Sequence, residues 1–189
     1  MEFSGKKVTV VGTGISGIGA VGLLNAVGAE VVLYDGNEKL KIEDIEKKLG
    51  TYKAEIVLGE LTKELTDSSD LLVISPGVPI DSPVVKAFEA AGVPIWGEVE
   101  LAYAFDKGKV LAITGTNGKT TTTALVGQIV GAYHKDTFVV GNIGNPYTTE
   151  VLKSNKDSYT VAEISSFQLE TVHEFHPLVS AILNITPDH

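Results

Sequence analysis

The sequence predicts an α/β fold with largely parallel sheets, because short apolar strands alternate with helical segments along its 189 residues. Two glycine-rich turns, Gly12 to Gly17 and Gly115 to Gly118, each follow an apolar strand and precede a helix. This order of elements is typical of nucleotide-binding α/β folds. We therefore expect a Rossmann-like N-terminal domain followed by a P-loop NTPase-like α/β region.

In the first half, short apolar runs between turn residues indicate strands. They lie at residues 8–11, 31–34, 55–58, 71–75 and 93–96. Helices are expected from about residue 16, over the charged stretch 38–49, and from Pro83 to about residue 91. Ser82 stands where an N-cap serine is favoured, and a proline at the first helical position already has a suitable φ angle.

We place a domain boundary at Gly97, which gives domains 1–97 and 98–189. The stretch 98–105 is a helical connection, and a second series of strands and helices begins at Val110. A helix is expected over residues 119–133, with strands at 137–140, 159–163 and 179–185.

Charge and composition exclude several classes of protein. The net charge of -9 argues against a nucleic-acid binder, which needs clusters of Lys and Arg. The absence of cysteine excludes disulfides and thiolate metal sites. No apolar stretch reaches membrane-spanning length, and charges and glycines interrupt the N-terminal apolar run that a secretory signal would need. We expect a cytoplasmic protein that binds neither nucleic acid nor membranes.

The run from Val110 to Thr121 predicts a nucleoside triphosphate site. Its glycines let backbone N–H groups face an anion, and the following helix directs its positive dipole end to the same point. Lys119 would neutralise phosphate charge and Thr120 would ligate Mg²⁺. Two residues separate the glycines where the usual P-loop has four, so the loop is a variant. The alternative is a plain glycine turn before a threonine-rich helix. The expected ATP-binding residues are Gly115, Thr116, Asn117, Gly118, Lys119, Thr120 and Thr121.

The first glycine motif, Gly12-Thr13-Gly14-Ile15-Ser16-Gly17, matches a dinucleotide-binding fingerprint. Asp35 ends the next strand, where a carboxylate would hydrogen-bond a ribose or a base edge. The alternative is helix-to-sheet packing through small residues, which Gly19, Ala20 and Gly22 support. Two nucleotide-type motifs on adjacent domains suggest an enzyme that joins two phosphorylated reactants.

Polar residues follow other strands of the second half. Asn142-Ile143-Gly144 lies in a loop where an amide can hold an anion or a sugar, or can simply form a turn. Glu163 ends a strand, where its carboxylate can reach a metal on a neighbouring P-loop. Ser165, Ser166 and Gln168 then offer two hydroxyls and an amide, although such residues are also common turn formers.

Taken in order, four segments resemble the Mur ligases of peptidoglycan synthesis: 114–121, 141–144, 163–169 and 184–189. The Glu-Ile-Ser-Ser-Phe-Gln-Leu run is most similar to the D-glutamate-adding member, and Ser75-Pro76-Gly77-Val78 also matches. The resemblance implies that the first domain holds the UDP part of UDP-N-acetylmuramoyl-L-alanine, with Ile15, Ser16 and Asp35 near the uridine diphosphate and Gly77 near the sugar. Family members often carry an Arg after the acidic residue, where this chain has Gly36-Asn37.

The resemblance also implies the chemistry. The alanyl carboxylate attacks the γ-phosphate of ATP, and the amine of D-glutamate then opens the acyl phosphate to an amide. The implied catalytic residues are Lys119, Asn142 and His189, the Mg²⁺ ligands are Thr120, Glu163 and His189, and Asn142, Ser165 and Gln168 lie near the substrate. Without the resemblance, His189 is an ordinary residue.

Family members have a longer central domain and a third domain that binds D-glutamate. We therefore expect this chain to be an N-terminal fragment, a monomer that carries only the first part of the central domain and no D-glutamate site, and that is inactive alone. Its central sheet is predicted to expose an apolar face. Which acceptor the ligase uses stays open, so another Mur ligase is an alternative.

Three further alternatives belong to other classes. An NAD-type nucleotide-binding protein would use the first glycine motif and Asp35 but would leave Lys119 without a role. A GTPase would use Asn155-Lys156-Asp157 to read guanine, but Ser158 stands where that motif needs Asp. A zinc protein would use His173 and His176, with no further cysteine or clustered histidine to complete the site.

Overall fold

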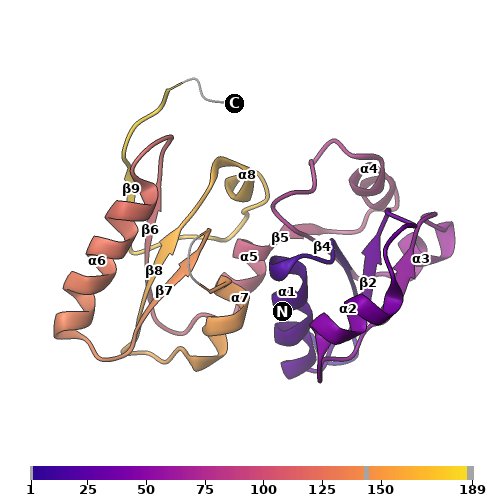
Figure 1. Cartoon of the computed structure of the whole chain (residues 1–189), viewed down its shortest axis with the longest axis horizontal. Coiled ribbons are helices and arrows are strands. Elements are labelled where there is room, and N and C mark those ends of the chain that lie inside the picture. The colour runs from indigo at the N-terminus through magenta and orange to yellow at the C-terminus, as the bar shows by residue number, and fades with distance from the viewer. Residues whose placement is uncertain (1, 143–144, 187–189) are drawn as a thin grey trace.

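The computed structural model describes residues 2–142 and 145–186, and these form two parallel sheets with helices packed on them (Figure 1). The first sheet has the strand order β3-β2-β1-β4-β5. Its strands are β1 (Lys7–Val11), β2 (Glu30–Asp35), β3 (Glu55–Leu58), β4 (Leu71–Ile74) and β5 (Ile95–Gly97). From β1 the chain adds β2 and β3 on one side, and it then returns to place β4 on the other side of β1. The loops after β1 and β4 therefore lie at a switch point of the sheet.

Four helices cover the two faces of the first sheet: α1 (Ile15–Ala26), α2 (Ile42–Leu49), α3 (Lys63–Ser68) and α4 (Pro83–Ala90). Alternate strand residues pack on opposite faces, so Val8 and Val10 join the core with α1 and α2, whereas Leu72 and Ile74 join the core with α3 and α4. The predicted strands and three of these helices are confirmed.

One local prediction in the first half needs correction, one helix was not predicted, and the predicted N-cap position of Ser82 is confirmed. Helix α2 begins at Ile42 rather than Glu38, because the Asn37 side chain accepts a hydrogen bond from Lys39 N (3.1 Å) and favours a turn there. Helix α3 was not foreseen, and its N-cap is Thr62, which accepts from Leu65 N. Ser82 does precede α4, but its hydroxyl forms no capping bond.

The second sheet has the order β7-β8-β6-β9, with all neighbours parallel. Its strands are β6 (Lys109–Thr114), β7 (Thr137–Gly141), β8 (Tyr159–Glu163) and β9 (Val179–Ile182). The other elements of this half are α5 (Glu98–Tyr103), α6 (Lys119–Tyr133), α7 (Tyr147–Glu150), η1 (Val151–Lys153) and α8 (Ser166–Leu169). Strand β9 ends three residues before the predicted residue 185, because Asn184 turns to bind the loop after β6.

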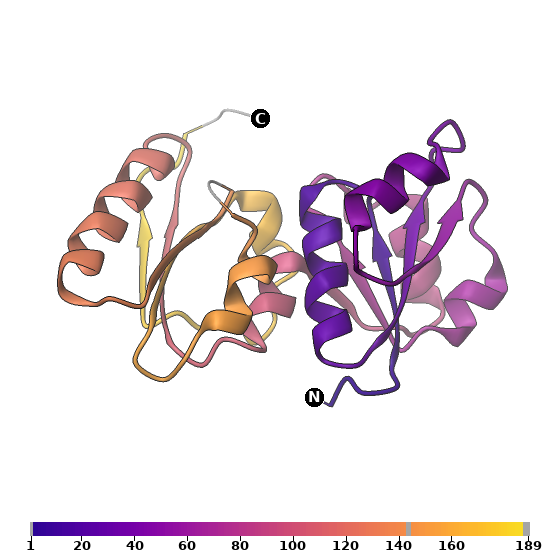
Figure 2. The same ribbon diagram turned by 60° about the horizontal axis from the view of Figure 1, so that its bottom comes forward.

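Helix α1 packs against α7 and α5 where the two halves meet, as two views of the ribbon show (Figures 1 and 2). A Cβ on Gly19 would lie 2.7 Å from the Thr148 hydroxyl oxygen, so the small residue lets α7 approach α1 closely. One buried cluster runs through the junction, from Leu23 and Leu24 of α1 through Leu101 to Tyr147. Gly19 thus serves packing between helices, whereas the alternative considered from the sequence was packing of α1 on the sheet.

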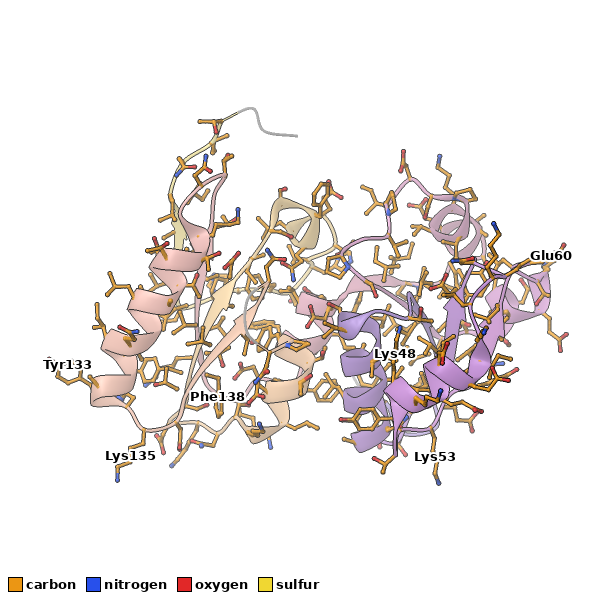
Figure 3. All side chains as sticks on the ribbon, viewed as in Figure 1. Lys48, Lys53, Glu60, Tyr133, Lys135 and Phe138 are labelled. Atoms are coloured by element: carbon orange, nitrogen blue, oxygen red, sulfur yellow. The ribbon has the colours of Figure 1, made fainter. Side chains whose placement is uncertain are left out.

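Apolar side chains of the second half are exposed on helix α6 and on the edge strand β9, whereas the prediction concerned the sheet. Leu125, Ile129 and Tyr133 follow one another at intervals of four on α6 and are 54%, 53% and 83% exposed. Tyr133 projects away from the end of the helix (Figure 3). Val179 and Ile182 of the edge strand β9 are 53% and 65% exposed. No helix in the described part of the chain is both long and apolar enough to cross a bilayer.

Candidate functional site

The carboxyl edge of the second sheet gathers polar residues from all four strands. Gly115 follows β6, Asn142 follows β7, Glu163 ends β8 and Asn184 follows β9. Because these strands are parallel, their carboxyl ends meet at one edge. The loops that were predicted to bind ATP, metal and substrate therefore lie together.

The glycine loop after β6 is held by a residue whose role was not foreseen. Asn184 O accepts from Thr116 N at 3.1 Å, and the Asn184 side chain both accepts from Asn117 N and donates to Asn117 O at 2.8 Å. Gly115 and Gly118 have φ angles of 141° and 83°, which a side chain would disfavour. The loop is thus ordered by its own glycines and by the segment after β9.

The Lys119 ammonium group lies over this loop and donates to Gly115 O at 2.7 Å and to Thr116 O at 3.0 Å. Helix α6 begins at Lys119 itself, so the first-turn N–H groups of the helix and the lysine charge face the same loop. Thr120 and Thr121 are exposed at the start of the helix. This arrangement is suited to an anion such as a triphosphate.

The Glu163 carboxylate has the surroundings expected of a cation ligand. It is 1% exposed, and its Oε1 accepts from Asn142 Nδ2 at 3.3 Å. Its Oε2 is buried and has no hydrogen-bond partner within the described residues. An unpartnered buried carboxylate oxygen is costly unless a cation or a further donor completes it, so Glu163 fits a Mg²⁺ ligand.

Of the other two metal ligands predicted from the sequence, the structure describes Thr120. The Thr120 hydroxyl is exposed on the first turn of α6, and His189 lies outside the described residues, as do Ile143 and Gly144. Within residues 2–142 and 145–186 no group of three or more His, Asp or Glu side chains forms a cation site by itself. A magnesium ion here would need substrate oxygens or water as further ligands.

A cavity of about 710 Å³ opens at this edge, and we call it the edge cavity. It brings together residues from both halves of the chain. Among the predicted residues, its lining includes Gly77, Gly115, Thr116, Lys119, Asn142 and Ser165. Ile15 lines a different cavity, and the other predicted residues that the structure describes stand outside the lining of this one: Ser16, Asp35, Asn117, Gly118, Thr120, Thr121, Glu163 and Gln168.

Ser165 and Gln168 form a capping box at the start of α8. Ser165 Oγ accepts from Gln168 N at 3.3 Å, and Gln168 Oε1 accepts from Ser165 N at 2.9 Å. Gln168 is only 4% exposed. Its side chain is therefore engaged within the protein, whereas Ser165 faces the edge cavity.

The first glycine motif has the geometry of a phosphate-binding turn. A Cβ on Gly17 would lie 1.9 Å from Gly12 O, while a Cβ on Gly14 would meet nothing within 4 Å. The turn is closed on the Gly17 side and open at Gly14, where a ligand can approach the backbone. Ile15 is 79% exposed beside it.

The Asp35 carboxylate is turned toward the same motif. Its Oδ2 accepts from Thr13 Oγ1 at 2.9 Å and from Thr13 N at 3.3 Å, and its Oδ1 accepts from Asn37 N at 3.1 Å. Asp35 thus joins the end of β2 to the glycine turn. This contact places an acidic group next to the site that the motif predicts.

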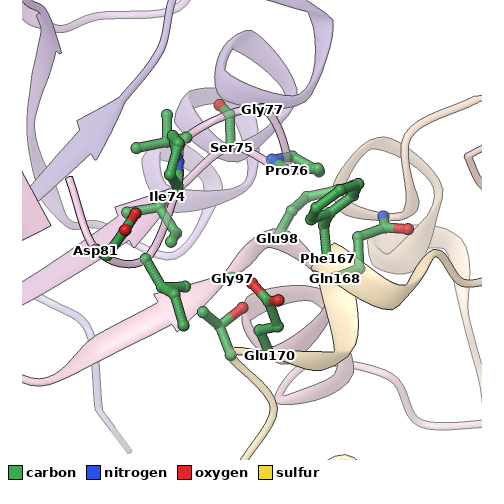
Figure 4. Close-up of a pocket in the computed structure, with 14 residues that line it drawn as sticks. Ile74, Ser75, Pro76, Gly77, Asp81, Gly97, Glu98, Phe167, Gln168 and Glu170 are labelled. Carbon is green, nitrogen blue, oxygen red and sulfur yellow. The ribbon is translucent and has the colours of Figure 1, made fainter. Parts of the chain in front are cut away.

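A second cavity, of about 670 Å³, lies at the junction of the two halves, and we call it the junction cavity. The loop from Ser75 to Asp81 lines one side, and Glu98 with residues of α8 lines the other (Figure 4). Glu98 is 3% exposed, and its burial raises the pKa of its carboxyl group, while hydrogen bonds from α7 and Gln168 oppose that rise. No sequence signal distinguished Glu98 from an ordinary helical glutamate.

The structure also bears on two alternatives from other classes. The Asn155 side chain accepts from Asp157 N at 2.9 Å and donates to Asp136, so it forms a local turn before β8, at the edge opposite the glycine loop. This position does not suit guanine recognition. His173 Nε2 lies 2.9 Å from Ile95 O, a contact that ties the second half to β5.

Two family models match the chain. The Mur ligase MurD-like N-terminal domain matches residues 6–97, and the Mur ligase middle domain matches residues 113–189. The chain is 71% identical to the UDP-N-acetylmuramoylalanine--D-glutamate ligase of Lachnospira eligens and 60% identical to that of Lachnoclostridium phytofermentans. Each match covers 100% of this chain and 42% of the relative, so the chain spans less than half the length of these relatives.

Solved structures show the same fold at low identity. The UDP-N-acetylmuramate:L-alanyl-gamma-D-glutamyl-meso-diaminopimelate ligase of Neisseria meningitides matches with a TM-score of 0.60 and 18% identity, over 98% of this chain and 62% of that one. The murein peptide ligase of Psychrobacter arcticus matches with a TM-score of 0.55 and 18% identity, over 96% of this chain and 43% of that one.

Proposed function

Because the chain belongs to the Mur ligase family, we propose that it forms the UDP-substrate and ATP-binding part of a ligase that joins D-glutamate to UDP-N-acetylmuramoyl-L-alanine. The observation that carries the proposal is the edge cavity. It places Gly77 of the first half opposite Lys119, Asn142 and Ser165 of the second. The D-glutamate site lies outside these residues, and the protein acts in the cytoplasm as a monomer.

The proposal divides the chain into a UDP-binding domain, 1–97, and the first part of an ATP-binding domain, 98–189. Support comes from Gly97, which ends the last strand of the first sheet, and from α5, which starts at the next residue. The open backbone at Gly14, with Ile15, Ser16 and Asp35 nearby, would take the uridine diphosphate. The sugar and alanyl group would extend past Gly77 into the edge cavity.

In the proposed reaction, an oxygen of the alanyl carboxylate attacks the γ-phosphorus of ATP, and the bond to the ADP oxygen breaks. The amine of D-glutamate then attacks the carbonyl carbon of the acyl phosphate, inorganic phosphate leaves and the amine loses a proton. Two anions must meet in the first step, so Lys119 and the first-turn N–H groups of α6 would reduce their repulsion. Asn142 and Ser165 would orient the attacking carboxylate.

Mg²⁺, when bound, would be held by Glu163 and Thr120 and would neutralise phosphate charge. The buried Oε2 of Glu163 supports this assignment, because within the described residues it has no other partner. By the family resemblance His189 would ligate a second Mg²⁺.

The direct test uses the complete protein that contains these residues. Phosphate release that requires ATP, UDP-N-acetylmuramoyl-L-alanine and D-glutamate together would support the proposal. Lys119→Ala is expected to lower kcat by about a thousandfold, the size of effect that one transition-state donor supplies. UDP-substrate binding by Lys119→Ala should persist. Activity with another amino acid but not D-glutamate would favour a different Mur ligase, and binding of NAD alone would refute the proposal.

A further inference from the structure

Glu98 lies where the two halves of the chain meet. It is the first residue of α5 and directly follows Gly97, the end of β5. It is 3% exposed and lines the junction cavity beside Gln168 (Figure 4). None of the ligand contacts proposed above involves Glu98, so a buried carboxylate at this position requires a separate explanation.

The carboxylate receives hydrogen bonds from two helices of the second half. Its Oε1 accepts from Thr148 N and from Thr148 Oγ1, each at 3.3 Å, at the start of α7. Tyr147 N and the side chain of Gln168 on α8 also favour the charged form of Glu98 and lower its pKa, against the effect of burial. One buried acid therefore interacts with both short helices.

In the sequence, each of the two helices follows a residue of the candidate site. The Gln168 oxygen accepts from Ser165 N at 2.9 Å, and the Gln168 side chain lines the junction cavity beside Glu98, so Gln168 lies between Glu98 and the Ser165 turn. Helix α7 carries Thr148, whose hydroxyl lies close to Gly19 of α1. Glu98 is thus linked to the Ser165 turn through Gln168 and to the first half through Thr148.

We propose that Glu98 is a positioning residue, which holds the Ser165 turn and the start of α7 in fixed relation to the first half and so shapes the UDP-substrate side of the edge cavity. This inference rests on the proposed function. The proposed role of Glu98 does not extend to the glycine loop 115–118, which would bind ATP. Asn184 holds that loop from the far side of β6. A residue that acts only on the UDP-substrate side should change KM for the UDP substrate more than KM for ATP.

The test is steady-state kinetics of the complete protein with Glu98→Ala. We expect KM for UDP-N-acetylmuramoyl-L-alanine to rise by about tenfold, as for the loss of one or two buried hydrogen bonds, and KM for ATP to stay within about twofold. Glu98→Gln keeps one acceptor oxygen for Thr148, so its KM should rise less. Thr148→Val removes only the hydroxyl donor and serves as a second variant if Glu98→Ala does not fold.

Glu100→Ala is the matched control. Glu100 is 1% exposed on the same helix α5 and accepts from His173 N and Glu174 N at 2.8 Å and from Phe175 N at 3.2 Å, so it holds residues 173–175 and not α7 or the Ser165 turn. This control variant should lower the thermal stability of the protein, but it should not raise KM for UDP-N-acetylmuramoyl-L-alanine relative to KM for ATP. Equal rises in both KM values for Glu98→Ala, or no rise in either, would overturn the inference. An inactive wild-type protein would instead count against the proposed function.

Discussion

The side chain of Asn184 forms a reciprocal pair of hydrogen bonds with the main chain of Asn117, each 2.8 Å long. The two residues are 67 positions apart and meet because β9 pairs with β6. Asn117 lies between Gly115 and Gly118 in the loop that is proposed to bind ATP, so the segment after β9 sets the shape of that loop. This contact leads to the first prediction.

Asn184→Ala should weaken ATP binding by about thirtyfold, because two hydrogen bonds of about 1 kcal/mol each no longer order the loop before ATP arrives. Isothermal titration with a non-hydrolysable ATP analogue measures the change. Asn25→Ala is the matched control, since Asn25 forms the same reciprocal pair with Lys53 in the first half. That control should lose similar stability and keep its ATP affinity, and equal losses of affinity in both variants would contradict the prediction.

Gly17→Ala should destabilise the fold by about 2 kcal/mol or more, because its Cβ would lie 1.9 Å from Gly12 O and the turn cannot yield without moving backbone. Gly14→Ala should change the unfolding free energy by less than about 0.5 kcal/mol, since a Cβ there meets nothing within 4 Å. Urea denaturation compares the two variants. If Gly14 faces the diphosphate, its alanine variant should still bind the UDP substrate more weakly.

Glu163→Gln should abolish stabilisation by Mg²⁺ without destabilising the metal-free protein. The wild-type carboxylate has a buried oxygen with no partner in the described structure, and a neutral amide costs less to bury. Thermal denaturation with ATP, with and without Mg²⁺, gives the readout. Glu150→Gln is the control, since both oxygens of Glu150 are already paired, with Asn145 and Lys153. A Mg²⁺ response that survives in Glu163→Gln would remove Glu163 from the metal site.

Stability should fall with rising pH because of Glu98. Burial raises the pKa of this carboxyl group in the folded state. The folded protein therefore holds its proton to higher pH than the unfolded chain does, and folding becomes less favourable as pH rises from the ordinary pKa of glutamate to the raised one. Glu98→Gln removes the titration, so its melting temperature relative to wild type should increase over this interval. A constant difference between the two proteins across that range would refute the prediction.

Much of the fold could be predicted because its signals are local. An apolar strand, a glycine turn and a helix start occupy adjacent positions, so both glycine motifs were found, and the predicted boundaries of α6 and β8 agree with Lys119–Tyr133 and Tyr159–Glu163. Prediction failed where side chains competed with helix formation, as Asn37 does before α2. The short helix α3 escaped notice because six residues carry too little periodicity to be recognised.

The candidate site was only partly predictable. Lys119, Asn142, Glu163 and Ser165 were identified from their sequence context, and the parallel strands bring them to one edge. Gln168 looked equally available, yet it is buried and bonded to Ser165. A glutamine in a loop has the same appearance in sequence whether it faces a ligand or caps a helix.

The order of amino acids was enough to predict the alternation of strands and helices, the two glycine turns and the residues able to carry phosphate and metal chemistry. Which of these residues meet depends on how the chain folds. Asn184 reaches the ATP loop because β9 adds next to β6, and Glu98 reaches Thr148, 50 residues away, because α5 and α7 pack together at the junction. The hydrogen-bond partner of a side chain depends on strand order and helix packing, which link residues far apart in the chain.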